Sequence, residues 1–204
     1  MSSATATALK TVLRQEMRKI LSDLPAETVR RESKIVTDII FSIPEYQMSS
    51  NISIYTSLPK GEINTRDLIK DALEQGKSCY VPRCNPQTGI MDMVKLVSYD
   101  DYLSLPLNHW GIPEPGLDEE RIIANELDMI IMPGLAFDHK KNRLGHGKGF
   151  YDRYLAKYKT KIRSTLPKTV ALALDVQVLN DGIIPTDQYD QKPDFILSAS
   201  KQIV

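Results

Sequence analysis

Apolar residues recur every three or four positions at the start of the chain. This spacing predicts an amphipathic helix over residues 5–22, because one face of a helix repeats about every 3.6 residues. The inward face would be formed by Leu9, Leu13, Met17, Ile20, Leu21 and Leu24. Pro25 suits the first turn of a second helix, which Pro44 ends.

Short apolar runs then predict strands. They are expected at residues 51–58, 78–82, 91–97, 127–132, 169–174 and 195–198. Asn64 or Thr65 is expected to cap a helix that ends near Gly76, and a later helix runs to about Lys159. Residues 98–127 are expected to be irregular, because several prolines interrupt them.

Helices that alternate with strands predict an α/β fold. We expect a mostly parallel central sheet in a three-layer arrangement flanked by helices, with N-terminal helices packed beside it. No repeat or linker divides the sequence, so residues 1–204 are expected to form a single domain.

The charge balance is even, with 26 basic and 26 acidic residues. No overall field therefore favours nucleic acid or an anionic membrane, and any anion site must be local. No apolar run approaches the roughly 20 residues that span a membrane. We expect no nucleic-acid or membrane partner, and a monomer. Cys79 and Cys84 are expected to be free thiols, since neither their number nor their spacing suggests a disulfide framework or a zinc site.

The first eight residues are rich in Ser, Thr and Ala, as transit peptides are. Glu16 and Asp23 follow early, and the helical pattern continues through them, which argues against that interpretation. The expected location is cytoplasmic, with a mitochondrial location left open.

The most informative segment is residues 142–153, where Gly145, Gly147 and Gly149 alternate with His146 and Lys148. A strand pattern precedes this segment and a helical pattern follows it. Glycines allow successive backbone N–H groups to converge on an anion, and a helix N-terminus adds partial positive charge. Lys148 would add a mobile charge. The segment therefore predicts a site for nucleotide phosphates.

The spacing of this loop excludes two better-known phosphate motifs. Lys148 is followed by Gly149 rather than by Ser or Thr, so the loop is not a Walker P-loop. The glycine spacing also differs from that of a dinucleotide fingerprint. A solvated basic surface turn remains the alternative, and spacing alone leads only to an anion site.

Other motifs accompany the loop in a specific order. They are Lys10 and Arg14 four apart, Gly61-Glu62-Ile63, Val81-Pro82-Arg83, Trp110-Gly111-Ile112-Pro113-Glu114-Pro115, Pro133-Gly134 with Phe137-Asp138, and the late Asp190 and Asp194. Together with the glycine loop, this set resembles the 5-formyltetrahydrofolate cyclo-ligase (methenyltetrahydrofolate synthetase) family. The resemblance extends from about Lys10 to Phe195.

The resemblance implies a ligase that cyclises 5-formyltetrahydrofolate to 5,10-methenyltetrahydrofolate with ATP, and releases ADP and phosphate. ATP phosphorylates the formyl oxygen, N10 of the folate attacks the activated carbon, and phosphate leaves. Such phosphoryl transfer needs positioning and charge stabilisation more than a protein nucleophile. The implied co-substrate is ATP and the implied cofactor is Mg²⁺.

The resemblance also assigns site residues. ATP contacts are expected from Lys10, Arg14, Arg143, Leu144, Gly145, His146, Gly147, Lys148, Gly149, Phe150 and Tyr151. Catalytic roles are expected for Lys148, Arg143 and Tyr151. Folate contacts are expected from Thr56, Glu62, Trp110, His146, Gly147, Lys148, Gly149 and Phe150. Asp152 and Asp190 are expected to bind the metal.

Simpler roles stay open for several of these residues. Lys10 and Arg14 could form an ordinary solvated basic face, and Asp152 could only complement the helix dipole. Asp190 could be a turn residue and Trp110 a core residue. Glu62 could likewise be a solvated turn acid, and Thr56 could simply pack in its strand.

Two positions depart from the family pattern. His146 stands where many relatives carry Arg or Tyr, and Phe150 stands where Tyr is common. A cationic contact through His146 would depend on pH, and a hydroxyl is missing at position 150. These departures bear on substrate affinity.

Two other classes of protein remain as alternatives. One is a non-catalytic module that binds folate or a phosphosugar on the same type of sheet. The other is a transferase or isomerase of the broader sheet family.

Overall fold

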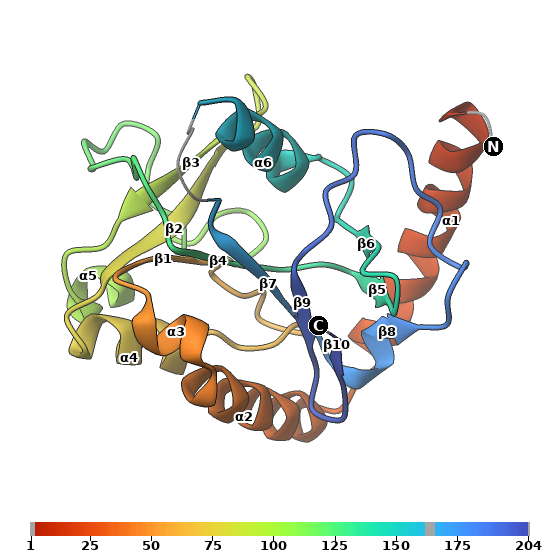
Figure 1. Cartoon of the computed structure of the whole chain (residues 1–204), viewed down its shortest axis with the longest axis horizontal. Coiled ribbons are helices and arrows are strands. Elements are labelled where there is room, and N and C mark those ends of the chain that lie inside the picture. Colours follow the sequence, from red (N-terminus) through yellow and green to blue (C-terminus); the bar gives the residue numbers. More distant parts are fainter. Residues whose placement is uncertain (1–2, 162–165, 204) are drawn as a thin grey trace.

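A seven-stranded sheet lies at the centre of the computed structural model, which describes residues 3–161 and 166–203 (Figure 1). Its order is β10-β9-β7-β4-β1-β2-β3. The strands are β1 (Asn51–Ile54), β2 (Ser78–Asn85), β3 (Ile90–Lys95), β4 (Met129–Met132), β7 (Lys168–Leu172), β9 (Phe195–Leu197) and β10 (Gln202–Ile203). The inner strands run parallel, whereas the edge strands β3 and β10 pair antiparallel. The predicted mostly parallel sheet is confirmed.

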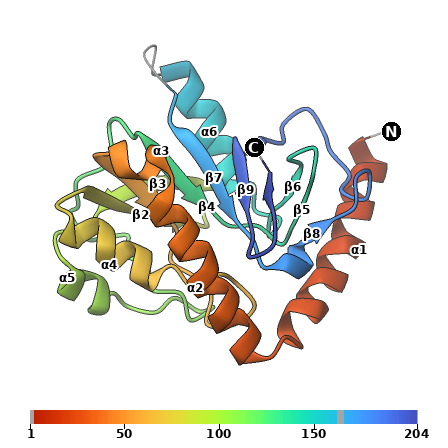
Figure 2. The ribbon, with the colours of Figure 1, turned by 60° about the horizontal axis from the view of Figure 1, so that its bottom comes forward.

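Helices cover both faces of this sheet. Along β4, Met129 and Ile131 belong to one core cluster and Ile130 and Met132 to the other, because successive strand residues point to opposite faces. The first cluster includes residues of α2 (Ala26–Ser42) and α4 (Arg66–Glu74), and the second includes residues of α6 (Phe150–Lys161). Figure 2 shows these helices on opposite sides of the sheet. The three-layer prediction is confirmed.

The N-terminal helices form as the pattern predicts, with two differences. Helix α1 (Ser3–Ser22) buries Met17 and Leu21, but Leu9 and Ile20 of the expected inward face are 44% and 45% exposed. Helix α1 packs at the side of the sheet rather than flat upon it, so a narrower stripe is covered (Figures 1 and 2). Pro44 not only follows the end of α2 but also begins the short helix α3 (Pro44–Met48).

Thr65 occupies the N-cap position of α4, but the side chain that bonds the first turn is that of Asn64. Its Oδ1 accepts a hydrogen bond of 2.9 Å from the N–H of Arg66. Thr65 precedes the helix directly, but its hydroxyl donates to the carbonyl of Tyr55 instead.

Strand β1 ends at Ile54 rather than at residue 58, and the chain then turns away from the sheet.

A second, three-stranded sheet was not expected. It consists of β5 (Ala136–Asp138), β6 (Arg143–Leu144) and β8 (Val178–Leu179), in the order β6-β5-β8, and the turn η1 (Asp175–Gln177) precedes β8. The prediction that residues 98–127 are irregular also misses helix α5 (Tyr99–Leu103), which begins where Ser98 Oγ accepts a hydrogen bond from Asp101 N. Elements of two to five residues are too short to show a hydrophobic period.

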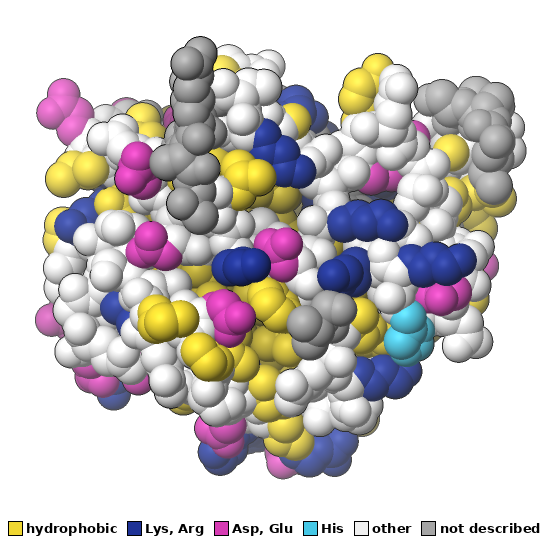
Figure 3. Space-filling view, in the orientation of Figure 1, with side chains coloured by type: hydrophobic (Ala, Val, Ile, Leu, Met, Phe, Trp, Pro, Cys, Tyr) yellow, Lys and Arg dark blue, Asp and Glu magenta, His cyan; other side chains and the backbone are white. Residues whose placement is uncertain are grey.

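The predicted free thiols are confirmed: Cys79 is buried and Cys84 half-buried. On the face shown in Figure 3, Lys and Arg side chains lie among Asp and Glu side chains.

Within residues 3–161 and 166–203, no helix is long and apolar enough to span a membrane.

Candidate active site

A cavity of about 580 Å³ opens where the central strands end. Its walls include Thr56, just after β1, and Pro133 and Gly134, which directly follow β4. Open parallel sheets bind ligands outside the carboxyl ends of their strands, because the connections diverge there. Its exposed lining is mainly apolar, and the apolar residues there include Leu21, Tyr55, Leu58, Pro82, Met91 and Ile112. Such a cavity suits a flat, largely apolar ligand held by a few polar groups.

Glu62 is one of those polar groups. Its side chain is buried at 6% exposure, and its Oε2 accepts a hydrogen bond of 2.7 Å from Leu58 N. The turn that carries it approaches α1 closely: Gly61 has φ +69°, and a Cβ there would lie 2.9 Å from the carbonyl oxygen of Leu21. Glu62 is therefore a fixed acceptor in the cavity wall and not a solvated turn acid.

Thr56 and Trp110 line the same cavity. Thr56 is 7% exposed, whereas Trp110 is 51% exposed at the rim. Trp110 is therefore not a core residue. His146 also lines the cavity, with its Nε2 3.8 Å from Glu62 Oε1. The glycine loop and the Glu62 turn thus meet across the cavity.

The glycine loop connects β6 to α6, but it is shorter than expected. Arg143 and Leu144 belong to β6, and the side chain of Leu144 is buried in the core at 1% exposure. The carbonyl of Leu144 also accepts a hydrogen bond of 2.7 Å from Leu135 N, so both its side chain and its carbonyl are engaged within the fold. Gly147 and Gly149 have φ of +106° and +64°, which side-chain-bearing residues rarely adopt.

Two arginines of α1 hold this loop by its carbonyl groups. Arg14 Nε donates to Gly145 O at 2.9 Å, and Arg18 Nη2 donates to His146 O at 3.1 Å. In a trans peptide the N–H points opposite to the preceding carbonyl. The N–H groups of His146 and Gly147 are consequently directed away from these guanidinium groups.

Arg143 lies at the inner end of the loop with its side chain 4% exposed. Its Nη2 donates to Asp152 Oδ1 at 2.8 Å, in the first turn of α6. Its Nε has no hydrogen-bond partner among the described residues, and neither has the hydroxyl of Tyr151. Burial raises the pKa of Tyr151 well above 10, so this hydroxyl stays protonated and can donate. Both residues line the cavity.

A buried donor without a partner costs about 1–3 kcal/mol, so two neighbouring ones need a physical reason. The Arg143 guanidinium carbon lies 5.8 Å from the centre of the Tyr151 ring. A bound ligand that offers oxygen atoms would satisfy both donors.

The segment before Arg143 builds this arrangement. Asp138 is fully buried and closes the β5–β6 hairpin by accepting hydrogen bonds from Asn142 N and Nδ2. A Cβ on Gly134 would lie 2.6 Å from the Phe137 ring and 3.2 Å from Arg143 Cγ. The Pro-Gly-x-x-Phe-Asp motif therefore places the Arg143 side chain.

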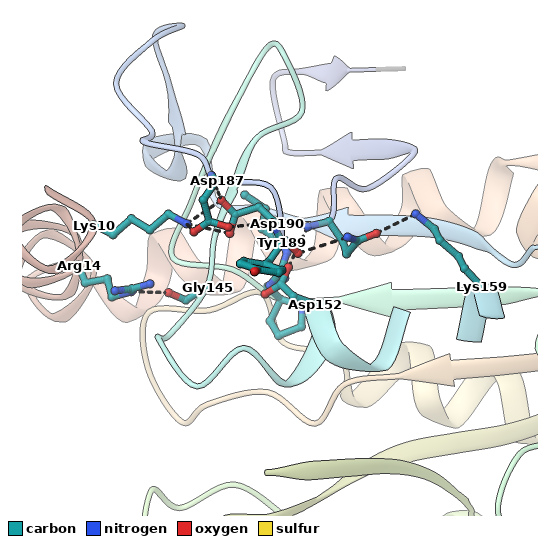
Figure 4. Close-up of polar contacts among 11 residues, drawn as sticks. Lys10, Arg14, Gly145, Asp152, Lys159, Asp187, Tyr189 and Asp190 are labelled. Atoms are coloured by element: carbon teal, nitrogen blue, oxygen red, sulfur yellow. Dashed lines mark hydrogen bonds and ion pairs between the residues drawn. The ribbon is translucent and has the colours of Figure 1, made fainter. Parts of the chain in front are cut away.

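Lys10 forms an ion-pair cluster with two carboxylates (Figure 4). Its Nζ lies 2.9 Å from Asp187 Oδ2 and 2.8 and 2.6 Å from the two oxygens of Asp190. Burial acts to lower the pKa of Lys10, but the hydrogen bonds and charges of Asp190 and Asp187 outweigh it and raise this pKa. Lys10 is thus a buried cation and not part of a solvated basic face, and its donors are already engaged.

Asp152 and Asp190 are linked through the residue that follows Asp190. Gln191 N donates to Asp152 Oδ1 at 3.0 Å. Burial and Arg18 lower the pKa of Arg14, while the charges of Asp190 and Asp152 act to raise it, so both carboxylates lie within electrostatic reach of Arg14. Asp190 also accepts from Asp187 N at 2.8 Å, so it is a turn residue as well.

The carboxylate oxygens of Asp152 and Asp190 differ in how many partners they already have. Oδ2 of Asp152 accepts no hydrogen bond within the described ranges, whereas both oxygens of Asp190 bind Lys10. Among the described residues, no three His, Cys, Asp or Glu side chains form a metal-binding group. Carboxylate oxygens suit Mg²⁺, which usually completes its shell with phosphate oxygens and water.

Sequence reasoning missed several residues of this site. Arg18 continues the spacing of Lys10 and Arg14 by four residues, so the helical period could have indicated it. Asp187 had no such signal. Gln177 had none either: it is buried, and its Nε2 donates to Gly134 O at 2.6 Å, which ties the cavity wall to η1.

Comparisons with known proteins match nearly the whole chain. The model of the 5-formyltetrahydrofolate cyclo-ligase family matches residues 6–199. A 5-formyltetrahydrofolate cyclo-ligase of Mus musculus is 40% identical over 200 residues, which is 97% of each chain. A probable 5-formyltetrahydrofolate cyclo-ligase of Schizosaccharomyces pombe is 35% identical and covers 95% of this chain and 97% of its own length. The solved structure of Aquifex aeolicus 5,10-methenyltetrahydrofolate synthetase has a TM-score of 0.73 and 27% identity, and covers 95% of this chain and 91% of its own. The chain therefore belongs to the 5-formyltetrahydrofolate cyclo-ligase family.

Proposed function

We propose that the cavity binds 5-formyltetrahydrofolate beside Glu62 and receives the terminal phosphate of ATP at the glycine loop. As a ligase of this family, the chain converts 5-formyltetrahydrofolate to 5,10-methenyltetrahydrofolate with ATP as co-substrate. The observation that supports the proposed geometry is a pair of buried donors, Arg143 Nε and the Tyr151 hydroxyl. Neither has a hydrogen-bond partner among the described residues, and both residues line the cavity.

The reaction explains why donors rather than a nucleophile line this cavity. The formyl oxygen takes the terminal phosphoryl group of ATP, and ADP leaves. N10 of the folate then attacks the formyl carbon and loses its proton to water, the carbon–oxygen bond breaks, and phosphate departs with that oxygen. Both steps develop negative charge on oxygen, which fixed N–H and O–H donors and cations stabilise.

Three residues carry catalytic roles in this proposal. Lys148 is exposed at the cavity, so its ammonium group can follow the transferred phosphoryl group. Arg143 is fixed by Asp152, and its free Nε donates to a phosphate or formyl oxygen. Tyr151 donates from its neutral hydroxyl. Arg14 and the main chain of residues 143–151 complete the nucleotide site. Lys10 joins them when Asp190 is shared between Lys10 and the magnesium ion.

Asp152 and Asp190 would hold Mg²⁺ together with phosphate oxygens and water. A bound magnesium ion neutralises phosphate charge and so lowers the barrier to phosphoryl transfer. In this chain Lys10 already neutralises Asp190, and Arg143 neutralises Asp152. Both carboxylates therefore keep a cation partner when no nucleotide is bound.

Folate recognition is assigned to the cavity wall opposite the glycine loop. Glu62 Oε2 already accepts from Leu58 N, so Oε1 is the oxygen open to a pterin N–H donor. Thr56 and Trp110 offer a hydroxyl and an aromatic face to the same ligand. Residues 146–150 contact the formyl end of the folate where the loop reaches the cavity.

The test is a paired measurement of methenyl product by ultraviolet absorbance and of ADP. Product should form only with ATP and 5-formyltetrahydrofolate together, with one ADP for each product. Folate binding without release of ADP would instead favour the non-catalytic module.

We further propose a single-domain monomer in the cytoplasm, without nucleic-acid or membrane partners. Light scattering of the purified chain and imaging of a tagged chain in cells test these points, with mitochondrial signal as the alternative.

A further inference from the structure

A short antiparallel hairpin carries Trp110 at its tip. Glu114 N donates to Pro106 O, and Asn108 N donates to Ile112 O, each at 2.9 Å. The Trp110 ring packs against the neighbouring His109 ring, with 3.4 Å between their centres. Even so, half of the tryptophan stays exposed at the rim of the cavity.

One side chain, Asn108, fixes both the tip and the base of this hairpin. Its Oδ1 accepts hydrogen bonds from Trp110 N at 3.0 Å and from Ile112 N at 3.1 Å. Its Nδ2 donates to Glu114 Oε2 at 2.7 Å. The amide orientation is set by these partners, since two N–H donors need the oxygen and a carboxylate needs the NH₂ group.

Glu114 joins the hairpin to the cavity wall. Its Oε1 accepts a hydrogen bond of 2.7 Å from Cys84 N on β2, and Cys84 and Glu114 both line the cavity. The tip also rests on the turn after β1: Gly111 has φ +76°, and a Cβ there would lie 3.0 Å from Pro59 Cγ. Trp110 is therefore held relative to both walls of the cavity.

We propose that Asn108 and Glu114 are positioning residues for the folate, which act by fixing Trp110 over the mouth of the cavity. This inference rests on the proposed folate site. An indole that is half exposed gains apolar contact when a flat ligand enters beneath it. Because Asn108 holds the main-chain N–H of Trp110 within connected hydrogen bonds, the backbone that carries the indole loses little freedom on binding, which favours affinity.

Reversal of the donor and acceptor in this pair is the decisive experiment. Asn108→Asp places a carboxylate against Glu114, and Glu114→Gln places an NH₂ group against a donor. In the double variant, the introduced glutamine amide donates to the introduced aspartate, and its oxygen still accepts from Cys84 N, so the network closes again. Each single variant should raise the KM for 5-formyltetrahydrofolate about tenfold. The KM for ATP should stay within about twofold, and the double variant should recover most of the loss.

Trp110 is the only tryptophan, so its fluorescence reports on the same site. Titration with 5-formyltetrahydrofolate alone should change the emission of the wild type and of the double variant. In each single variant, the midpoint of this change should shift to a higher folate concentration. In a Trp110→Ala background, Asn108→Asp should add less than about twofold to the KM. If Asn108 had a purely structural role, Asn108→Asp would raise this KM by its full factor in the Trp110→Ala background as well.

Equal rises in both KM values, no rescue in the double variant, or full additivity with Trp110→Ala would overturn the inference. If the wild type bound folate without turnover, the proposed function would fail, while the fluorescence titrations would still decide this proposal. If catalysis is normal and both single variants match the wild type, only this inference fails.

Discussion

Arg143 Nη2 donates a hydrogen bond of 2.8 Å to Asp152 Oδ1, and the eight residues between the two contain the whole glycine loop. The bond joins the start of β6 to the first turn of α6, so it closes the loop into a ring. Glycine-rich segments are entropically costly to order, and this clasp limits their freedom in the absence of ligand. The loop amides are consequently held near one arrangement before phosphate arrives.

Arg143→Lys should open this ring. A lysine keeps the positive charge but loses the planar fork and the free Nε, so it cannot hold Asp152 and donate to a ligand together. We expect kcat to fall at least about tenfold, or roughly 1.4 kcal/mol of transition-state stabilisation. Amide hydrogen exchange of residues 145–149 should become faster.

Arg30→Lys is the matched control, since Arg30 is exposed and pairs with Glu27 on α2, away from the glycine loop. It should leave kcat and loop exchange unchanged. If Arg143→Lys kept the wild-type kcat and the wild-type amide protection of residues 145–149, the order of the loop would not depend on the bond between Arg143 and Asp152.

Lys148→Ala removes a mobile charge whose side chain forms no ion pair or hydrogen bond within residues 3–161 and 166–203. The side chain is exposed, so the free energy of unfolding should change by less than about 0.5 kcal/mol. We expect turnover to fall at least about tenfold, because a cation near the transferred phosphoryl group is lost. Lys157→Ala on the exposed side of α6 serves as the control. Turnover within twofold of wild type in Lys148→Ala would remove Lys148 from the mechanism.

The layers of this fold could be predicted from the sequence because long helices keep a hydrophobic period and strands buried on both faces are continuous apolar runs. Met129–Met132 is such a run, and it forms a strand buried on both faces. The β5–β6 hairpin could not be read, since β6 has two residues and depends on the contacts of Asp138 with Asn142. Arg143 was therefore expected in a loop, although it projects from a strand.

Contacts between residues that are far apart in the sequence also limited what could be predicted of the site. Lys10 and Asp187 are 177 residues apart, so no local pattern could indicate that they meet. The helical spacing of Lys10 and Arg14 predicted a shared face but not that Lys10 is buried. The glycine loop, by contrast, could be located from sequence because its residues are contiguous.

Asp152→Asn should separate the clasp from the metal site. The asparagine oxygen can still accept from Arg143 and from Gln191 N, so exchange protection of the loop should persist. Loss of the carboxylate charge weakens Mg²⁺ binding, so the Mg²⁺ concentration that supports half-maximal ATP binding should rise at least about tenfold. Isothermal titration with ATP at several Mg²⁺ concentrations measures this. An unchanged Mg²⁺ dependence would place the metal elsewhere.

Tyr151→Phe should affect activity and stability in opposite directions. The hydroxyl is buried without a partner in the described part of the chain, so its removal should leave the free energy of unfolding unchanged or raise it by up to about 1 kcal/mol. Turnover should fall about tenfold, since a donor to the reacting oxygen is lost. Urea unfolding and steady-state kinetics measure the two effects.

Tyr158→Phe gives the opposite pair of results. Tyr158 OH accepts a hydrogen bond of 2.7 Å from Leu127 N, away from the cavity. Its loss should lower the free energy of unfolding by about 1 kcal/mol and leave turnover unchanged. If Tyr151→Phe destabilised the chain as Tyr158→Phe does, its hydroxyl would have a structural partner in solution.

Asp187→Asn should reveal a stabilising ion pair through its dependence on pH. The hydrogen bond from Lys10 lowers the pKa of Asp187, and Tyr189 N and Asp190 N add to this effect. A carboxyl with a lowered folded-state pKa stabilises above its unfolded pKa of about 3.9, and the contribution disappears as pH falls through the folded value. Urea unfolding of both proteins should therefore show a constant stability difference between about pH 5 and pH 9, which shrinks below about pH 4. A difference that persisted unchanged at pH 2 would mean that Asp187 acts through hydrogen bonds its amide replacement cannot make, rather than through its charge.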